Sequence, residues 1–199
     1  MHRMGVVGVW HVHAADYVDE AMRRDDVTIV GVWDRDHEAA LAFAQPRGLP
    51  VVPELEILLG DPSIDVIVVN TATSDHVDVV TRALEAGKNV FCEKVLAFRP
   101  EDAAELEELA LRRGLTLAVS FQRLAEAWVP TLDAVVKSGV LGRITSSRIR
   151  YQHAGAIDGW LPDGFFSPTE AGGGAVIDLG VHGFYLSLLF HGTYPTTVT

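Results

Sequence analysis

The sequence predicts an α/β protein with a doubly wound parallel sheet over residues 1–122, followed by the beginning of an α+β domain over residues 123–199. Two observations support this fold class. Through the first part, short apolar runs alternate with segments of helical period, which is the pattern of a parallel sheet covered by helices. After residue 122 the alternation stops, and β-branched, aromatic and glycine-rich stretches replace it.

The elements of the first domain follow one another regularly. Apolar runs predict strands at residues 4–9, 27–33, 51–52, 65–70, 89–92 and 115–121. Helices are expected between them at residues 13–24, 36–44, 54–59, 75–86 and 100–113. Pro100 suits the first turn of its helix, and Gly87 and Gly114 suit the C-terminal caps of theirs.

The second part predicts a different arrangement. Helices are expected at residues 125–138 and 175–190, and residues 143–152 alternate like an antiparallel strand with one solvated face. Residues 196–199 resemble the start of a further strand. One strand, a loop and a helix do not form a self-sufficient layer. We therefore expect either a truncated product or another chain that supplies the rest.

The composition excludes some partners. The chain has 199 residues, a net charge of −11 and acidic residues spread along its length. Such a surface repels nucleic acid and anionic membranes, and no apolar run is expected to approach the ~18 residues that span a bilayer. Cys92 is the only cysteine, so neither a disulfide framework nor a thiolate zinc cluster is expected. We expect a soluble cytoplasmic protein with no nucleic-acid or membrane partner.

A glycine turn lies between the first strand and the first helix. Gly8 is placed for the tight turn of the Rossmann dinucleotide fingerprint, G-x-G-x-x-G, but Trp10 and His13 stand where the second and third glycines belong. By itself the turn is equally consistent with a plain strand-to-helix junction. As a phosphate-binding turn, it would place Gly8, Trp10, His11 and Val12 against a dinucleotide.

An acidic residue ends the second strand. Asp34 lies 26 residues beyond Gly8, where a carboxylate can accept hydrogen bonds from the adenosine ribose and repel the 2′-phosphate of NADP. The adjacent Arg35 would partly offset that repulsion. NAD is therefore the expected cofactor and NADP stays possible. A simple turn residue at the strand end is the alternative role of Asp34.

Glu93 and Lys94 come directly after the apolar run 89–92. The carboxyl ends of parallel strands border the crevice in which such sheets bind ligands. A lysine there can donate a charge-assisted hydrogen bond to a reacting oxygen. A solvated ion pair of little energetic value is the alternative.

Asp178 and His182 are four residues apart in the helix expected at 175–190, so they share one face. Because this helix is apolar nearly all round, we expect it to be buried and its ionisable groups to be paired or functional. A carboxylate beside an imidazole raises the imidazole pKa toward a value useful for proton transfer. A purely structural pair is the alternative.

Three motifs together resemble the Gfo/Idh/MocA oxidoreductases, the family of glucose–fructose oxidoreductase and inositol dehydrogenase. Residues 70–76, N-T-A-T-S-D-H, are similar to the family segment A-T-P-x-x-x-H. Residues 86–94, A-G-K-N-V-F-C-E-K, resemble the run into its E-K-P signature. Residues 172–182 resemble its G-G-G-x-x-x-D-x-G-x-H segment. The resemblance covers nearly the whole chain, whereas family members continue through a large antiparallel sheet.

The resemblance implies an NAD(P)-dependent oxidoreductase that transfers a hydride between nicotinamide and a hydroxyl or carbonyl group of a sugar or cyclic polyol. It implies catalytic roles for three residues, with His182 as the base, Lys94 as a donor to the same substrate oxygen and Asp178 as the group that orients His182. It also implies a homo-oligomer formed through the C-terminal sheet.

Further site residues are expected on the same grounds. The residues expected at the cofactor are Gly8, Trp10, His11, Val12, Asp34, Arg35, Asn70, Thr71, Ala72, His76, Glu93 and Lys94. Gln122 and Arg123, just past the last Rossmann strand, are expected at the pocket wall, and Trp160 lies in the loop expected to set substrate specificity.

Two alternatives stay open. The altered glycine turn and the early end of the chain favour a catalytically incomplete member of the family that binds a nucleotide or a partner. A metal-dependent hydrolase built on His11 and His13 is the weaker alternative, because no third ligand has supporting spacing. No metal is therefore expected.

Overall fold

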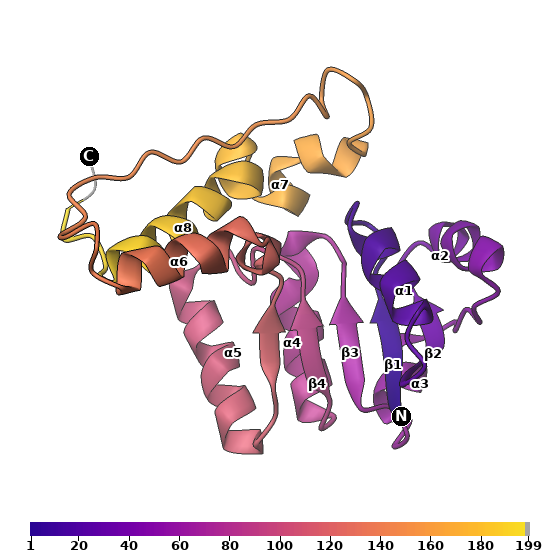
Figure 1. Ribbon diagram of the computed structural model, residues 1–199. Coiled ribbons are helices and arrows are strands. Elements are labelled where there is room, and N and C mark those ends of the chain that lie inside the picture. The colour runs from indigo at the N-terminus through magenta and orange to yellow at the C-terminus, as the bar shows by residue number, and fades with distance from the viewer. Residues whose placement is uncertain (198–199) are drawn as a thin grey trace.

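A five-stranded parallel sheet forms the centre of the computed structural model, which describes residues 1–197 (Figure 1). The strands are β1 (His2–Val7), β2 (Val27–Trp33), β3 (Val66–Val69), β4 (Asn89–Cys92) and β5 (Leu117–Val119). Their order is β2-β1-β3-β4-β5, and neighbouring strands are parallel throughout. The predicted doubly wound fold is confirmed, with its switch in strand order between β1 and β3, where such sheets bind ligands.

Helices join the strands and flank the sheet (Figure 1). They are α1 (Ala14–Met22), α2 (His37–Ala44), α3 (Leu55–Gly60), α4 (His76–Glu85) and α5 (Pro100–Arg113). The Asp36 carboxylate caps α2 by accepting from the N–H groups of Glu38 and Ala39. Gly114 ends α5 at φ +66°, as its position predicts.

Apolar side chains cover both faces of the sheet. Val6 and Val7 of β1 face opposite sides: Val7 packs in one cluster with Ile67, and Val6 packs in another with Val18 and Val32. All five side chains are fully buried. Because neither face meets water, the central strands carry continuous apolar runs rather than alternating ones.

The rest of the chain lies across the carboxyl edge of the sheet (Figure 1). It contains α6 (Trp128–Lys137), α7 (Pro168–Ala171) and α8 (Val181–His191), with a π-helical turn at Val176–Gly180 before α8. Val129 of α6 packs against Leu186 and Phe190 of α8 in a small separate core. The C-terminal segment thus covers the edge at which the strands end.

Several predicted elements of this segment are wrong. Residues 143–152 form no strand, because the described residues offer them no second strand to pair with; they run extended, and Ile149 packs on α8. The helix expected at 125–138, by contrast, is confirmed as α6, which begins at Trp128 and follows a 3₁₀ turn at Gln122–Ala125. The strand start expected at 196–199 is absent at 196–197, and residues 198–199 lie outside the described residues. In the first domain, residues 51–52 contribute only an isolated bridge.

The apolar helix expected at 175–190 is not a single α-helix, and it is only partly buried, through His182, Leu186 and Phe190. It begins with the π turn, and Val176 and Phe184 are 66% and 63% exposed. The segment Pro168–His191 has 24 residues, and an 18-residue window within it has a mean hydropathy of 1.4, long and apolar enough by those measures alone to cross a membrane. The expectation that no apolar run approaches this length is therefore wrong, although one such helix is weak evidence for a span.

Gly8 has no room for a side chain. Its φ is +87°, and a Cβ there would lie 2.6 Å from Thr71 Cα, against backbone that cannot rotate away. We expect Gly8→Ala to lower the free energy of unfolding by about 2–4 kcal/mol, measured by urea unfolding. Gly48→Ala is the matched control, since Gly48 has φ +66° and open space around it, and it should cost only about 1 kcal/mol. Equal losses would contradict the crowding at Gly8.

Candidate functional site

The strand ends bring polar residues together along the carboxyl edge of the sheet. Gly8 follows β1, Asn70 follows β3, Glu93 follows β4 and Ser120 follows β5. Backbone hydrogen bonds fix these positions; Glu93 N–H, for example, donates to Val69 O at 2.9 Å. Residues that are far apart in the chain therefore form one row.

Asp34 is fixed beside the glycine turn. Its Oδ2 accepts from Val9 N–H at 2.7 Å, and its Oδ1 accepts from Asp36 N–H at 2.8 Å. A cavity of about 450 Å³ opens next to this carboxylate, and Trp33 and Ala72 line its apolar side. Asp34 thus joins the end of β2 to the turn after β1 and faces a space large enough for a ligand.

Polar groups lie unpaired at the end of β3. Both polar side-chain atoms of Asn70 and the Thr71 hydroxyl are buried without a hydrogen-bond partner among residues 1–197. Buried polar groups ordinarily have partners, so these atoms are available to a polar ligand. His76 is placed differently: its ring nitrogens lie 2.8 Å from Val95 O and 3.2 Å from Thr71 O, so it ties two loops together.

A buried carboxylate lies beneath the glycine turn. Glu93 is fully buried, and its Oε1 lies 3.1 Å from His13 Nδ1 and 3.5 Å from His11 Nε2. Its Oε2 accepts from the Tyr17 hydroxyl, which also contacts Ser120 Oγ. Side chains from the turn, α1 and the ends of β4 and β5 thus form one hydrogen-bonded cluster.

Burial and hydrogen bonding set the charges in this cluster. Burial alone would raise the pKa of Glu93, but hydrogen bonds from His13 and Tyr17, together with the nearby His11, bring it below its usual value, so Glu93 is ionised at neutral pH. Burial lowers the pKa of His11 to about 3 despite the attraction of Glu93, so His11 is neutral. The result is a buried anion held by hydrogen bonds.

The same cluster brings three metal-ligating groups together. Ligand atoms of His11, His13 and Glu93 lie within 4.8 Å of one another. The expectation that the two histidines lack a third ligand is therefore wrong; nothing in their spacing points to Glu93, which only the fold brings near. Hydrogen bonds nevertheless account for the cluster. His13 N–H donates to His11 Nδ1 at 3.2 Å, which leaves the ring proton on Nε2, facing Glu93.

Lys94 links the sheet to the C-terminal segment. Its ammonium donates to Asp178 Oδ1 at 2.7 Å and to Asp178 O at 2.8 Å. The Lys94 side chain is 4% exposed and that of Asp178 is 23% exposed. Burial would raise the pKa of Asp178, but Lys94 brings it below its usual value, so the Asp178 carboxylate is ionised at neutral pH.

A histidine that sequence reasoning missed lies on the other side of this pair. His153 Nε2 is 3.6 Å from Asp178 Oδ2. Trp160, which is half exposed, packs against the His153 ring at a centroid distance of 4.8 Å. Trp160, the residue expected to set specificity, therefore contacts His153, which in turn contacts Asp178. No sequence pattern marks His153, because it belongs to an extended segment without regular structure.

The predicted pairing of Asp178 with His182 is wrong. His182 Nδ1 lies 2.8 Å from the Tyr185 hydroxyl. The Asp178 carboxylate turns to Lys94 because a buried ammonium costs more to leave unpaired than a neutral imidazole does. The predicted rise in the His182 pKa is also wrong, since burial and the charge of Lys94 lower it to about 4. His182 is therefore neutral at physiological pH.

The two residues expected at the pocket wall lie close to these groups. Gln122 Nε2 is 3.4 Å from His13 Nε2, at the edge of the Glu93 cluster. The Arg123 guanidinium stacks on the Tyr151 ring at 4.3 Å, and that ring in turn contacts His182. Both residues thus border the region between the glycine turn and α8.

Trp10 closes the crevice above the glycine turn. Its indole stacks on Phe165 with ring centres 4.6 Å apart, and its Nε1 donates to Glu170 Oε2 at 3.0 Å. Gly164 lies so close to the indole that it has no room for a Cβ. Between this stack and Lys94, only a hollow of about 20 Å³ is left. Sequence reasoning missed Phe165 and Glu170, because only the fold brings them to Trp10.

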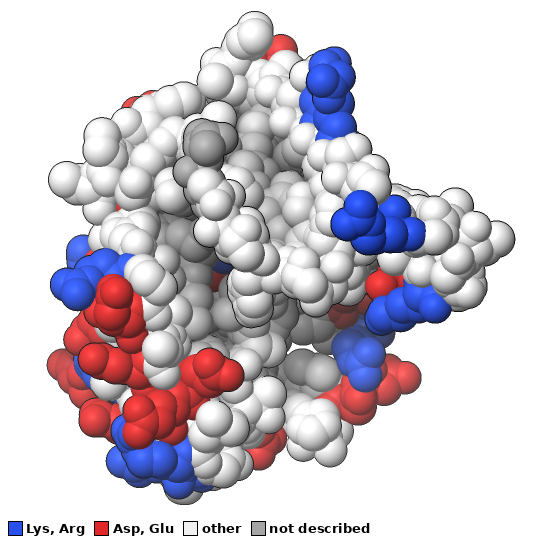
Figure 2. All heavy atoms as spheres, turned by 90° about the vertical axis from the view of Figure 1, so that its left-hand side faces the viewer, with Lys and Arg blue, Asp and Glu red and all other residues white. Residues whose placement is uncertain are grey.

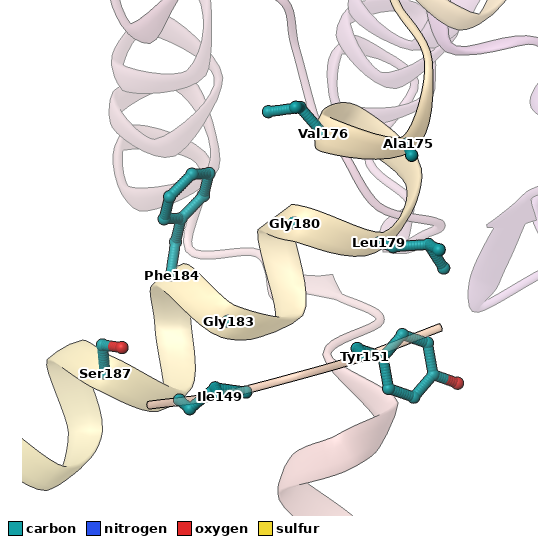
Figure 3. A pocket seen from close by; sticks show the side chains of 9 residues that line it. All are labelled: Ile149, Tyr151, Ala175, Val176, Leu179, Gly180, Gly183, Phe184 and Ser187. Atoms are coloured by element: carbon teal, nitrogen blue, oxygen red, sulfur yellow. The ribbon is translucent and has the colours of Figure 1, made fainter. Parts of the chain in front are cut away.

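A separate hollow of about 410 Å³ lies between α8 and the extended segment at Ile149 and Tyr151 (Figure 3). None of the predicted site residues lines it. On the face that Figure 2 shows, most charged side chains gather in the lower part, whereas the upper part carries few of them. The predicted site residues therefore border the carboxyl edge rather than this hollow.

The doubly wound sheet, its glycine turn and the cavity beside Asp34 define a class of protein, an α/β domain with a dinucleotide-binding edge. Residues 2–121 match the family described as "Oxidoreductase family, NAD-binding Rossmann fold", and residues 129–199 match the "GFO/IDH/MocA C-terminal domain". The chain belongs to the GFO/IDH/MocA oxidoreductase family, as its motifs predict.

Individual relatives agree with this assignment. The chain is 33% identical to 1,5-anhydro-D-fructose reductase of Ensifer adhaerens, covering 92% of this chain and 54% of that protein. It is 32% identical to D-glucoside 3-dehydrogenase of Escherichia coli, covering 90% and 51%. GenD2 from gentamicin A biosynthesis, solved with NAD, superposes with a TM-score of 0.82 at 25% identity, covering 96% and 54%. The chain thus spans about half the length of these relatives.

The neutral state of His11 has a consequence for stability. Because its pKa is about 3 in the folded state and about 6.5 when unfolded, the unfolded chain binds more protons between these values, and stability falls as the pH drops through that range. We expect His11 to account for about 2 kcal/mol of the stability lost between pH 7 and pH 5. In urea unfolding at the two pH values, His11→Asn should lose less stability than the wild type.

The control for this prediction is His37→Asn, at an exposed position at the start of α2. It should keep the wild-type difference between the two pH values. The same pH dependence in wild type and His11→Asn would contradict a buried, neutral His11.

Proposed function

We propose that this protein is an NAD-dependent oxidoreductase that transfers a hydride between nicotinamide and a hydroxyl or carbonyl carbon of a sugar or cyclic polyol. The observation that carries the proposal is the buried Lys94–Asp178 pair at the carboxyl edge of the sheet. A solvated ion pair would be worth little. A buried ammonium at the ligand-binding edge of this fold is instead placed to donate to a substrate oxygen.

The residues along the edge suit a dinucleotide. The cavity of about 450 Å³ beside Asp34 has room for adenosine, with the carboxylate free to accept from ribose hydroxyls on its remaining lone pairs. Gly8 lets the backbone turn tightly, and the unpaired polar atoms of Asn70 and Thr71 are available to the cofactor. When bound, nicotinamide supplies the carbon that accepts or donates the hydride.

Three side chains divide the work at the substrate. In the oxidation direction, neutral His182 accepts the hydroxyl proton at Nε2, and the substrate carbon loses its hydride. This role requires the ring proton on Nδ1, the nitrogen that lies 2.8 Å from the Tyr185 hydroxyl. Lys94 donates to the same oxygen and stabilises the negative charge that develops there. Asp178 contacts Lys94 rather than His182, so its role is to hold the ammonium in place.

The substrate class is inferred from the relatives. Those cited above are named as enzymes of 1,5-anhydro-D-fructose and of D-glucosides. We place a sugar or polyol between Lys94 and the wall formed by Gln122, Arg123 and Trp160. The exposed apolar side chains of the α8 region support a homo-oligomer formed through the C-terminal domain, and the single cysteine supports a reducing, cytoplasmic location.

A second candidate is a family member that binds a nucleotide without turning over a substrate. The observation that favours it is the stack of Trp10 on Phe165, which leaves only about 20 Å³ in front of Lys94. The space in front of Lys94 becomes large enough for a nicotinamide ring only if residues 163–171 move away. The two candidates differ in turnover: the first oxidises or reduces a substrate, and the second binds the nucleotide alone.

Removing the base or the ammonium should abolish turnover but not cofactor binding. We expect His182→Gln and Lys94→Met each to lower kcat for sugar oxidation by about 10²–10⁴-fold, while the Kd for NADH changes by less than about threefold. His191→Gln, also on α8 but paired with Ser147, is the matched control and should keep the wild-type rate. Absence of turnover in the wild type, with NADH bound, would favour the second candidate.

Separating Trp10 from Phe165 should ease cofactor entry. If the stack must open first, the closed state lowers the apparent affinity. We expect Phe165→Ala to raise the association rate of NADH by about tenfold, measured by stopped-flow energy transfer from tryptophan. Phe166→Ala, at a neighbour that is 57% exposed and outside the stack, should have no such effect. An unchanged rate in Phe165→Ala would contradict the opening step.

A further inference from the structure

We propose that Asp75 is a second determinant of cofactor choice and that it acts through Arg35. By holding the Arg35 guanidinium in an ion pair, Asp75 keeps it from the 2′-phosphate that distinguishes NADP from NAD. The site then prefers NAD more strongly than Asp34 alone would achieve. This inference rests on the proposed function, because it places the adenosine of a dinucleotide in the cavity beside Asp34.

The cavity beside Asp34 is acidic. Carboxylates outnumber the cations among the residues that line it: the carboxylates are Asp34, Asp36, Asp75, Asp78 and Glu170, and the cations are Arg35 and Arg82. A phosphate monoester carries a charge of about −1.5 to −2 at neutral pH. It can be held in such surroundings only where a guanidinium is free to pair with it.

Arg35 is the arginine placed for that task. It directly follows Asp34 at the end of β2, and an arginine near the ribose-binding acid is the usual partner of a 2′-phosphate. Here Arg35 Nη2 lies 2.9 Å from Asp75 Oδ2. The Arg35 side chain is 77% exposed, whereas that of Asp75 is 22% exposed. The Asp75 carboxylate is therefore the less mobile partner, and the position of the Arg35 guanidinium is set by it.

The position of Asp75 allows it to be changed without harm to the fold. It ends the 3₁₀ helix Thr73–Asp75 before α4, where its N–H, not its side chain, makes the turn by donating to Ala72 O at 2.9 Å. An ion pair whose arginine is mostly exposed to solvent, as Arg35 is, contributes little to stability. Removing the carboxylate would therefore act mainly on the ligand, since it takes one negative charge from the cavity and releases Arg35.

The other arginine of the cavity provides the control. Arg82 pairs with Asp78 and Glu56. Asp78 thus matches Asp75 in three respects: it lines the same cavity, carries the same charge and pairs with an arginine. It differs in its partner, because the ion pair of Arg35 is with Asp75, so Asp78→Asn tests the loss of one negative charge from the cavity without the release of Arg35.

The experiment is a fluorescence titration of the purified full chain with NADH and with NADPH. The variants are Asp75→Asn, Asp78→Asn and the double variant Arg35→Ala/Asp75→Asn. We expect Asp75→Asn to tighten NADPH binding by about tenfold, the size of one hydrogen bond to a charged group, and to leave the Kd for NADH within about twofold. Asp78→Asn should change NADPH binding by less than about twofold, and Arg35→Ala should remove the gain of Asp75→Asn.

Each contrary outcome has a separate meaning. If NADH binds and Asp75→Asn leaves NADPH binding unchanged, or if Asp75→Asn and Asp78→Asn have equal effects, the role of Asp75 is overturned while the proposed function stands. A gain that persists after Arg35→Ala overturns it as well. If neither dinucleotide binds the wild type, the proposed function fails and the role of Asp75 fails with it.

Discussion

The ion pair between Lys94 and Asp178 is the contact on which the rest of the site depends. Lys94 follows β4, so its ammonium leaves the sheet edge into nearly dry surroundings, with 4% of its side chain exposed. A buried ammonium without a partner costs several kcal/mol, and Asp178 offsets that cost with its carboxylate and its carbonyl oxygen. Because the buried ammonium needs this partner, the ion pair holds the segment before α8 on the carboxyl edge of the sheet. His182, which lies four residues after Asp178, is thereby placed at the same edge.

The glycine turn is held by the same kind of constraint. Its two departures from the dinucleotide fingerprint are the side chains that tie it to its surroundings: His13 reaches the buried Glu93, and Trp10 reaches Phe165 and Glu170 in the C-terminal segment. His13 and Trp10 therefore break the glycine pattern of the sequence motif, but their contacts stabilise the turn in the structure. The parallel sheet makes this possible because it ends β1 and β4 at one edge.

Regular elements could be predicted from the sequence, whereas the partners of polar side chains could not. The strands of the Rossmann domain are marked by apolar runs, and Gly114 and Pro100 mark the ends of α5. Two groups compete for the Asp178 carboxylate: the His182 imidazole on the next helical turn and the buried Lys94 ammonium, 84 residues away in the sequence. The spacing of residues in the sequence does not show which of them pairs with it. Residues 143–152 carry the pattern of a strand, but a strand also needs a neighbour with which to pair.

The most direct test of the central contact is hydrogen exchange of the α8 amides in the wild type and in Lys94→Met. If the ion pair holds this segment on the sheet edge, exchange in Val181–His191 should be at least about tenfold faster in Lys94→Met, with β1 and β3 unchanged. Lys88→Met removes an equally buried ammonium, whose acceptors are Asp61 O and Ile64 O, at a distance from α8 in the chain, and should leave α8 as in the wild type. Equal protection of α8 in the wild type and in Lys94→Met would contradict the account.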